Sequence, residues 1–253
     1  MAKKNKTKRN SRTTCVLFAL AIVLLLTSVV GGTYAALRYR SQSYAARITM
    51  HDIGVTLVEN DQPISWRNYS GKNGVWNEKS GTLLSDMLGE DREVELGKQY
   101  PEKLCVANTG AIDEFVRVRV FKYWADEEGN RLTNLNPDYI NLDIQGDGWY
   151  ENPAEKTTER TVLYYTKALA PEEVSTSFLQ SVTIDTAVCN KVTETTTVDS
   201  EGYKIIETVY HYDGAKFVVK AQVDAVQTHN AEDAILSAWG LNVNVENGVL
   251  HFE

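Results

Sequence analysis

KFVVKAQVDAVQ, residues 216–227, is the stretch that decides the fold class. Apolar and polar side chains alternate along it, which is the pattern of a β-strand with one buried face. The apolar positions are Phe217, Val219, Ala221, Val223 and Ala225, and the polar positions are Lys220, Gln222 and Asp224. This is the most regular alternation in the chain, and it predicts a long strand in an all-β fold.

The residues on either side of this strand predict two hairpins and one helix. Residues 192–212 are rich in Thr and Val, whose branching at Cβ favours strands. The only helix predicted after the N-terminus runs from about 230 to 239, with Asn230 as its N-cap and Gly240 as its stop. The chain then ends in residues that pair as a hairpin about Asn247-Gly248.

Period-two alternation also occurs earlier in the chain. Ile53, Val55 and Leu57 share one face of a predicted first strand. Residues 104–120 predict an antiparallel hairpin about the turn 108–110, with Arg117 and Arg119 on its solvent face. Residues 149–165 predict another hairpin with a long polar tip.

Residues 61–92 are rich in Asn, Ser, Gly and charge, and they predict a long connection with one helical turn around residues 83–88. Trp66, Tyr69 and Trp76 are spread along this connection. We interpret them as side chains that hold the loop to the core, and a carbohydrate-binding platform is the alternative.

The N-terminus has the pattern of an export signal. Six basic residues precede an apolar run from Cys15 to Val30, and GGTYAAL follows as residues 31–37. The pattern predicts a signal peptide over residues 1–35, cleaved between Ala35 and Ala36. An uncleaved hydrophobic helix within residues 15–37 is the alternative, because this length approaches the ~20 residues of a membrane-spanning helix. Either reading places the remaining chain outside the cell.

Composition limits the partners of the exported part. The chain has 253 residues, 43% of them hydrophobic, which is enough for a core. Its net charge of -8 becomes -14 without the six basic residues of the signal, which argues against nucleic acid or anionic lipid as partners. Residues 51–253 predict one domain, and residues 36–50 form a separate segment without a good apolar face.

The sequence offers no recognisable catalytic or metal site, so we expect no enzyme and no cofactor. The four histidines are far apart in sequence, and no HExxH, GxSxG, P-loop or Rossmann pattern occurs. The acidic turn at residues 125–130 lacks the spacing of a calcium loop, and so do Asp143 and Asp147. An active site assembled from distant residues is the alternative. Cys105 and Cys189 are either joined in a disulfide or are free thiols.

Several segments resemble the TasA/camelysin-like exported proteins of Gram-positive bacteria, which are processed by an alternate, SipW-type signal peptidase. They are GGTYAAL, IGVTLVEN, LCVANTGAIDEFVRVRV, GWYEN with VLYYTKALAPEEVSTSFLQSVTI, and KAQVDAVQTHNAEDAILSAWG. Together they cover about half of the exported chain in the expected order. The resemblance implies a jelly-roll-like antiparallel β-sandwich, secretion to the cell surface, and a role as a biofilm-matrix or fibre subunit.

The resemblance also implies a mode of assembly. The segment that follows the cleavage site would add as a strand to a neighbouring subunit, and Leu37, Tyr39, Tyr44, Ile48 and Met50 are its candidate assembly residues. The partners would then be the signal peptidase and further copies or other matrix subunits, with membrane contact only through residues 15–37 before cleavage. The alternative is a monomeric adhesin or ligand-binding module, which Trp66, Trp76 and Trp149 on one exposed face would favour. The sequence lacks the metal-ligand motif that a protease activity, described for some camelysins, would need.

Overall fold

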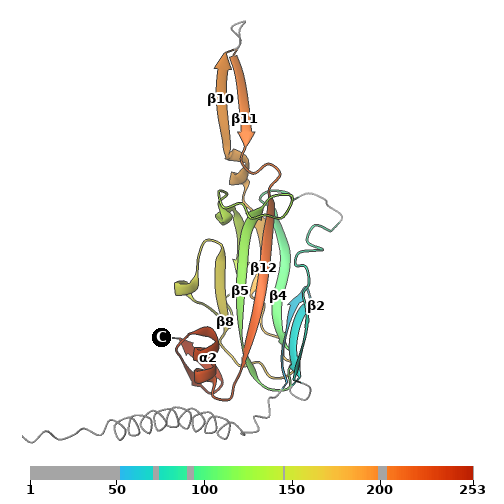
Figure 1. The fold of residues 1–253 in the computed structure, drawn as a ribbon, viewed down its shortest axis with the longest axis vertical. Helices are drawn as coiled ribbons and strands as arrows, with labels where there is room; N and C mark the ends of the chain where they lie inside the picture. The colour runs from blue at the N-terminus through green and yellow to red at the C-terminus, as the bar shows by residue number, and fades with distance from the viewer. Residues whose placement is uncertain (1–51, 71–73, 90–93, 145, 199–203, 253) are drawn as a thin grey trace, which may run out of the picture. The chain divides into compact units, whose positions relative to one another are not determined.

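We describe the fold from a computed structural model of the chain, which describes residues 52–70, 74–89, 94–144, 146–198 and 204–252. These residues form a mostly β fold in which the strands of each sheet pair antiparallel, with one short α-helix (Figure 1). The predictions for the N-terminus lie outside the described residues. They concern the cleavage site Ala35 and Ala36, and the assembly residues Leu37, Tyr39, Tyr44, Ile48 and Met50.

Two sheets contain most of the strands. The first has the order β3-β2-β1-β4-β9-β6 and the second the order β12-β5-β8-β7. The strands of the first sheet are β1 (Ile53–Glu59), β2 (Gln62–Ser70), β3 (Val75–Lys79), β4 (Gln99–Asn108), β6 (Ile140–Ile144) and β9 (Leu179–Ile184). Those of the second are β5 (Glu114–Ala125), β7 (Trp149–Glu151), β8 (Arg160–Tyr165) and β12 (Lys216–Gln227).

Two hairpins, one α-helix and three 3-10 turns complete the described elements. The hairpins pair β10 (Val192–Val198) with β11 (Lys204–Tyr210), and β13 (Val243–Glu246) with β14 (Val249–Phe252). The helix and turns are α2 (Ala231–Trp239), η1 (Pro137–Tyr139), η2 (Pro153–Glu155) and η3 (Thr186–Asn190).

The two sheets share one apolar core. Its fully buried members include Leu104 and Val106 from β4, Val118 from β5 and Leu179 from β9. A second, smaller core lies between Phe115 of β5, α2 and the β13–β14 hairpin. Successive residues of a strand point to opposite faces. Phe115 and Val118 therefore face opposite ways, and α2 with β13–β14 covers the face of the second sheet that is turned away from the first.

Several local predictions are confirmed. β12 has the predicted bounds, Lys216–Gln227, and β1 buries its predicted apolar face. The last hairpin turns at Asn247 and Gly248, which both have positive φ as a type I′ turn requires. The helix ends at Gly240, whose backbone N–H donates to Leu236 O. Asn230 precedes the helix as predicted, but its side chain makes no capping hydrogen bond because its own backbone is left-handed.

The hairpin predicted over residues 104–120 is wrong. β4 pairs with β1 and β9, whereas β5 pairs with β12 and β8, so residues 109–113 cross from one sheet to the other. Asn108 fixes this crossing, because its side-chain amide donates to Ile112 O at 2.7 Å and to Leu169 O at 2.8 Å. The turn residues were identified correctly, but the partner strands were not.

The long connection predicted over residues 61–92 is also wrong, because it contains β2 and β3. Asn60 and Asp61 both have positive φ, so they form the tight turn between β1 and β2. Only the predicted turn at residues 83–88 is present, with Met87 N donating to Leu84 O. β3 is exposed at every position and β2 is only half-buried, so neither strand has a clear apolar alternation.

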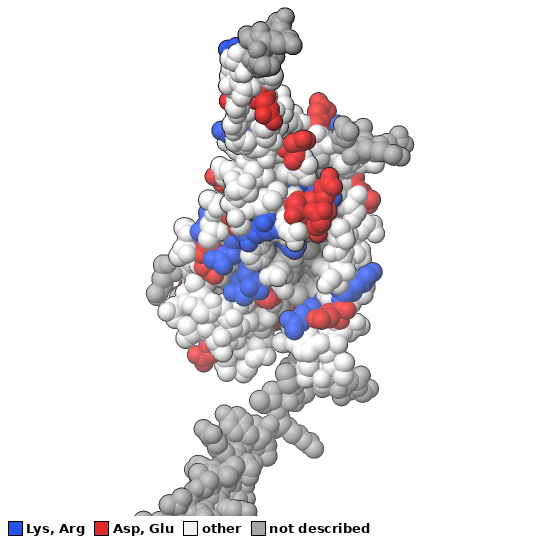
Figure 2. Space-filling model, turned by 45° about the horizontal axis from the view of Figure 1, so that its top comes forward, with Lys and Arg blue, Asp and Glu red and all other residues white. Residues whose placement is uncertain are grey.

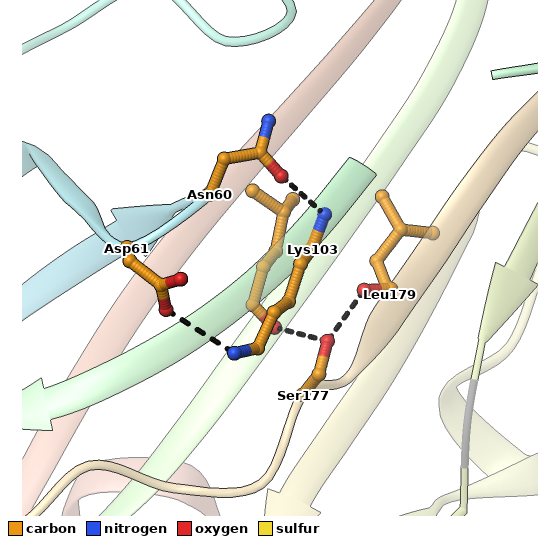
Figure 3. A network of polar contacts seen from close by, with 6 residues as sticks. Asn60, Asp61, Lys103, Ser177 and Leu179 are labelled. Atoms are coloured by element: carbon orange, nitrogen blue, oxygen red, sulfur yellow. Dashed lines mark hydrogen bonds and ion pairs between the residues drawn. The ribbon is translucent and has the colours of Figure 1, made fainter. Parts of the chain in front are cut away.

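Side chains fix the β1–β2 turn to β4 (Figure 3). The backbone N of Lys103 donates to Asn60 Oδ1 at 2.9 Å, and Lys103 Nζ donates to Asp61 Oδ1 at 3.1 Å. On the other side of β4, the Ser177 hydroxyl is placed to donate its one hydrogen to the carbonyl oxygen of Leu104 or to that of Leu179, which joins β4 to the start of β9. The direction in which β2 leaves β1 is therefore set by contacts with β4.

The two cysteines are free thiols in this structure. Cys105 is buried in β4, where burial raises its pKa, and Cys189 is exposed in η3. A side chain at Gly97 would touch Thr186 of η3, so η3 lies beside the start of β4. Cys105 is eight residues further along, about 25 Å at ~3.3 Å per residue. A disulfide requires Cα atoms within about 6 Å, so the disulfide alternative does not fit this arrangement.

Glu114 joins the crossing to the start of β1. It is fully buried, and its Oε1 accepts a hydrogen bond from Gly54 N at 2.9 Å. Its Oε2 has no hydrogen-bond partner among the described residues. Burial raises the pKa of Glu114 from its ordinary value of 4.5 to about 7, and the bond from Gly54 opposes this shift. Ionisation of Glu114 therefore costs stability in the folded protein.

Glu114→Gln should change how stability depends on pH. Because the pKa is raised on folding, the contribution of Glu114 is fully present below about pH 4.5 and is lost as pH rises to about 7. The native chain should lose up to about 3 kcal/mol over this range through Glu114. The glutamine variant, which still accepts from Gly54, should lack this loss. Urea unfolding from pH 4.5 to 8 measures it, and equal slopes for both proteins would contradict the assignment.

Candidate functional site: an open groove beside β12

The outer edge of β12 is unpaired in the described part of the chain. β12 pairs with β5 along all twelve of its residues and is the last strand of its sheet. Such an edge presents backbone N–H and C=O groups that can pair with another extended segment. Long free edges are usually shortened or covered in soluble proteins, so a twelve-residue edge marks a candidate binding site.

A groove runs along this edge, between β12 and the strands β1 to β3 of the other sheet. It consists of three cavities of about 780, 320 and 160 Å³. The first two share Leu57 and Ala221, and the last two share Val55 and Val223. Because neighbouring cavities have common walls, the groove is continuous and follows β12 from Phe217 to Ala225.

The end of the groove near Phe217 is apolar. Leu83, Leu84 and Met87 of the turn segment after β3 line the largest cavity together with Phe217. Leu84 N donates to Glu59 Oε1 at 2.7 Å, which holds this segment against β1. Burial raises the pKa of the Glu59 carboxyl, and the bond from Leu84 opposes that shift. This end of the groove can accept large apolar side chains.

The middle of the groove is charged. Asp224 Oδ2 accepts from Arg117 Nη2 at 2.8 Å and pairs with Arg119 Nη2 at 3.0 Å. Across the groove, Arg67 pairs with Glu78 at 3.4 Å. On the face of the molecule in Figure 2, basic and acidic side chains lie close together and form no broad field of one sign. The middle of the groove therefore offers both signs of charge to a bound chain.

The prediction that Arg117 lies on a solvent face is wrong. Its side chain is only 10% exposed, and its guanidinium lies 5.3 Å from the ring centroid of Trp239 in α2. Arg119 is 34% exposed, and its Nε is buried without a hydrogen-bond partner in the described ranges. The alternation along β5 was correct, but α2 covers the face that the pattern assigned to water.

The three tryptophans that would favour an adhesin do not converge. Trp76 is 48% exposed at the groove, with Tyr69 at 5.1 Å and the Arg67 guanidinium at 4.4 Å from its ring centroid. Trp66 lines the groove beside Lys79. Trp149 is buried in the shared core, where its ring packs on Phe178. Two of the three therefore lie at the groove, and they lie on strands rather than on a loop.

The described ranges contain no group of three or more His, Cys, Asp or Glu side chains arranged to hold a metal ion. Within those same ranges, no helix has the length and apolar character needed to cross a membrane.

No protein-family model, curated protein or solved structure matches the chain. The function is therefore inferred from the geometry of the groove and from the residues that line it. Sequence reasoning missed this groove because it missed β2 and β3, which form one wall. The Asn60-Asp61 pair was the available signal, since both residues tolerate the left-handed conformation of a tight turn.

Asp224→Ala should destabilise the protein, because it leaves the buried Arg117 guanidinium without its carboxylate. We expect the free energy of unfolding to fall by about 2–3 kcal/mol. Glu95→Ala removes an exposed partner of Lys98 and should cause a much smaller loss. Urea unfolding of both variants at pH 7 measures the difference, and equal losses would show that the Arg117–Asp224 pair is not structurally important.

Proposed function

We propose that this chain is an exported, non-enzymatic structural subunit of the TasA/camelysin-like kind, with a jelly-roll-like β-sandwich that assembles into cell-surface or biofilm-matrix fibres. After cleavage by an alternate signal peptidase, residues 36 to about 50 of one copy add as a strand to the free edge of β12 in another copy. The single observation that carries the proposal is the continuous groove beside a twelve-residue unpaired edge.

The length of the groove supports strand addition. From Phe217 to Ala225 the groove is about 26 Å long at ~3.3 Å per residue. The donor segment has fifteen residues and is therefore long enough to span it with several residues to spare. Main-chain hydrogen bonds to the β12 edge would provide affinity, and the side chains that face the groove would provide specificity.

The side-chain pattern of the donor segment also fits an edge of this kind. In an extended strand, Leu37 and Tyr39 point to one side, and Arg38 and Arg40 point to the other. The apolar pair can then enter the groove while Arg38 and Arg40 point to the face of the sheet that carries Arg117 and Asp224. Arg47 shares the side of Leu37 and Tyr39, so in this register it must lie beyond the end of the groove.

A monomeric adhesin or ligand-binding module is the second candidate. One observation favours it, namely that Trp76 and Trp239 line the same 160 Å³ cavity as Arg67 and Arg117. Aromatic and guanidinium groups together suit a small ligand with a flat apolar surface and an acidic group. Strand addition explains the whole length of the groove, whereas a small ligand explains only this end.

Assembly should depend on the donor segment. We expect purified residues 36–253 to form filaments in negative-stain images and to scatter light strongly, and a version that starts at Thr49 to remain monomeric. A synthetic peptide of residues 36–50 should bind the shorter version with 1:1 stoichiometry in titration calorimetry. Two monomeric proteins and no peptide binding would reject strand donation and favour the adhesin.

Filling the groove should block assembly. Ala221 lines the two larger cavities, so Ala221→Trp places a large side chain where the donor strand would lie. We expect peptide affinity to fall at least tenfold and filaments to disappear. Thr161→Trp is the matched control, because Thr161 lines a separate cavity bordered by β6 and β8. Filaments from the Ala221 variant, or their loss in both variants, would contradict the assignment of the groove.

A further inference from the structure

The β10–β11 hairpin is a two-stranded ribbon that extends past the end of the two sheets (Figure 1). Each described residue of β10 from Thr193 onwards, and each residue of β11, is exposed. Five of its large apolar side chains are 49–67% exposed, and they are Val198, Ile205, Ile206, Val209 and Tyr210. Most of the visible surface of the ribbon is uncharged in Figure 2. Five of the nine large apolar side chains that are exposed in the described ranges therefore lie on this ribbon.

The apolar side chains occur on both faces of the ribbon. Residues paired across two antiparallel strands point to the same face. Ile205 and Val209, paired with Thr197 and Thr193, therefore lie on one face. Ile206 and Tyr210, paired with Thr196 and Val192, lie on the other. An isolated two-stranded ribbon is marginally stable in water, so these faces favour a partner that covers at least one of them.

The base of the ribbon is firmly attached. His211 N donates to Lys191 O at 2.8 Å, which continues the β10–β11 pairing by one step. The ring of Tyr212 packs on Trp124 with a centroid distance of 5.0 Å, and its hydroxyl accepts from Asn136 N at 2.9 Å. The ribbon thus has a fixed origin on the body and two uncovered faces beyond it.

The ribbon stands at one particular end of the groove. The chain passes from Tyr210 directly into β12 through residues 211–215, so the base of the ribbon adjoins the Phe217 end. β1 begins at the opposite end, because Ile53 lines the same cavity as Ala225. The donor segment immediately precedes Ile53 in the chain. In each copy it therefore starts from the end of the groove that is far from the ribbon of that same copy.

These positions determine where the next copy lies, given the proposed strand donation. If residues 36–50 of the next copy run antiparallel to β12, residue 50 emerges at the Phe217 end of the groove. The Ile53 end of the next copy then sits beside the ribbon, and the arrangement repeats head to tail without closing. The parallel direction would bring the two Ile53 ends together and give no such repeat.

We propose that the β10–β11 ribbon is a second contact between neighbouring copies of this chain in the fibre, and that it packs against the copy whose donor strand occupies the adjoining groove. This inference rests on the proposed function. Each face of the ribbon has an area of roughly 250 Å². This estimate multiplies a length of seven residues at ~3.4 Å per residue by the width of two strands that are ~4.8 Å apart, with their side chains. A stable interface needs about 800 Å² per partner, so the ribbon cannot hold two free copies together.

Strand donation removes this limitation. Once the donor strand links two copies, the ribbon contact becomes intramolecular, with an effective concentration in the millimolar range. A small apolar contact is sufficient under that condition. The ribbon would then stiffen the junction and lower the concentration at which fibres form, without being required for the donor strand to bind.

The test uses the exported chain, residues 36–253, with Ile205→Ser and Val209→Ser together in one variant and Ile206→Ser and Tyr210→Ser together in another. We expect at least one variant to raise the critical concentration for fibre formation fivefold or more in sedimentation assays. Binding of the 36–50 peptide to the corresponding chains that start at Thr49 should stay within twofold. Critical concentrations within twofold of the unaltered chain, for both variants, overturn the ribbon proposal alone.

A second measurement keeps the proposal testable if the variants fold poorly. Thr195→Cys in a Cys189→Ser background carries a fluorescent dye on the ribbon without removing any apolar residue. Quenching of the dye by iodide should fall at least threefold on fibre formation, and unchanged quenching overturns the proposal. The unaltered chain forming no fibres, with no peptide binding, overturns the strand-donation function and the ribbon contact together.

Discussion

The continuous pairing of β12 with β5 is the interaction on which the rest of this structure depends. It is formed over twelve residues, and it places Asp224 opposite Arg117 on the ladder. Because α2 and the last hairpin follow β12 directly, this pairing also determines which face of the second sheet they cover. It leaves the other edge of β12 facing β1, β2 and β3 across a groove, with no strand of the described chain in between.

The crossing at residues 109–113 is the second constraint, because it decides that the two strong strands around it enter different sheets. Glu114 and Asn108 hold it with buried side-chain hydrogen bonds to backbone groups of distant segments. A buried carboxyl with one unpartnered oxygen is costly when ionised. Glu114 therefore lowers the free energy of unfolding at neutral pH, although it connects the two sheets at this crossing. The position of the β1 start relative to the groove depends on that connection.

The groove and the ribbon together suggest an assembly with a division of tasks. In the proposed assembly, the unpaired edge would supply directional backbone pairing, which determines register and order, and the small apolar surface would act only after two copies are linked. Neither feature requires a catalytic constellation or a metal, and both use the strand as the unit of recognition. The net charge of -8 is compatible with the proposed assembly, because mutual repulsion between copies opposes non-specific association.

The sequence by itself determined the local elements of this fold. The alternation in β12, the turn at Asn247-Gly248 and the stop at Gly240 each depend on residues close together in the chain, and the structure has them where the sequence places them. The sequence did not predict β2 and β3, because these strands bury too little apolar surface to show the period-two alternation of a half-buried strand.

Only the tertiary structure decided that β4 and β5 belong to different sheets, that α2 covers Arg117 and that β12 keeps a free edge. The physical reason is that pairing and coverage depend on hydrogen bonds and contacts between residues 50 to 100 or more positions apart, which no local pattern records.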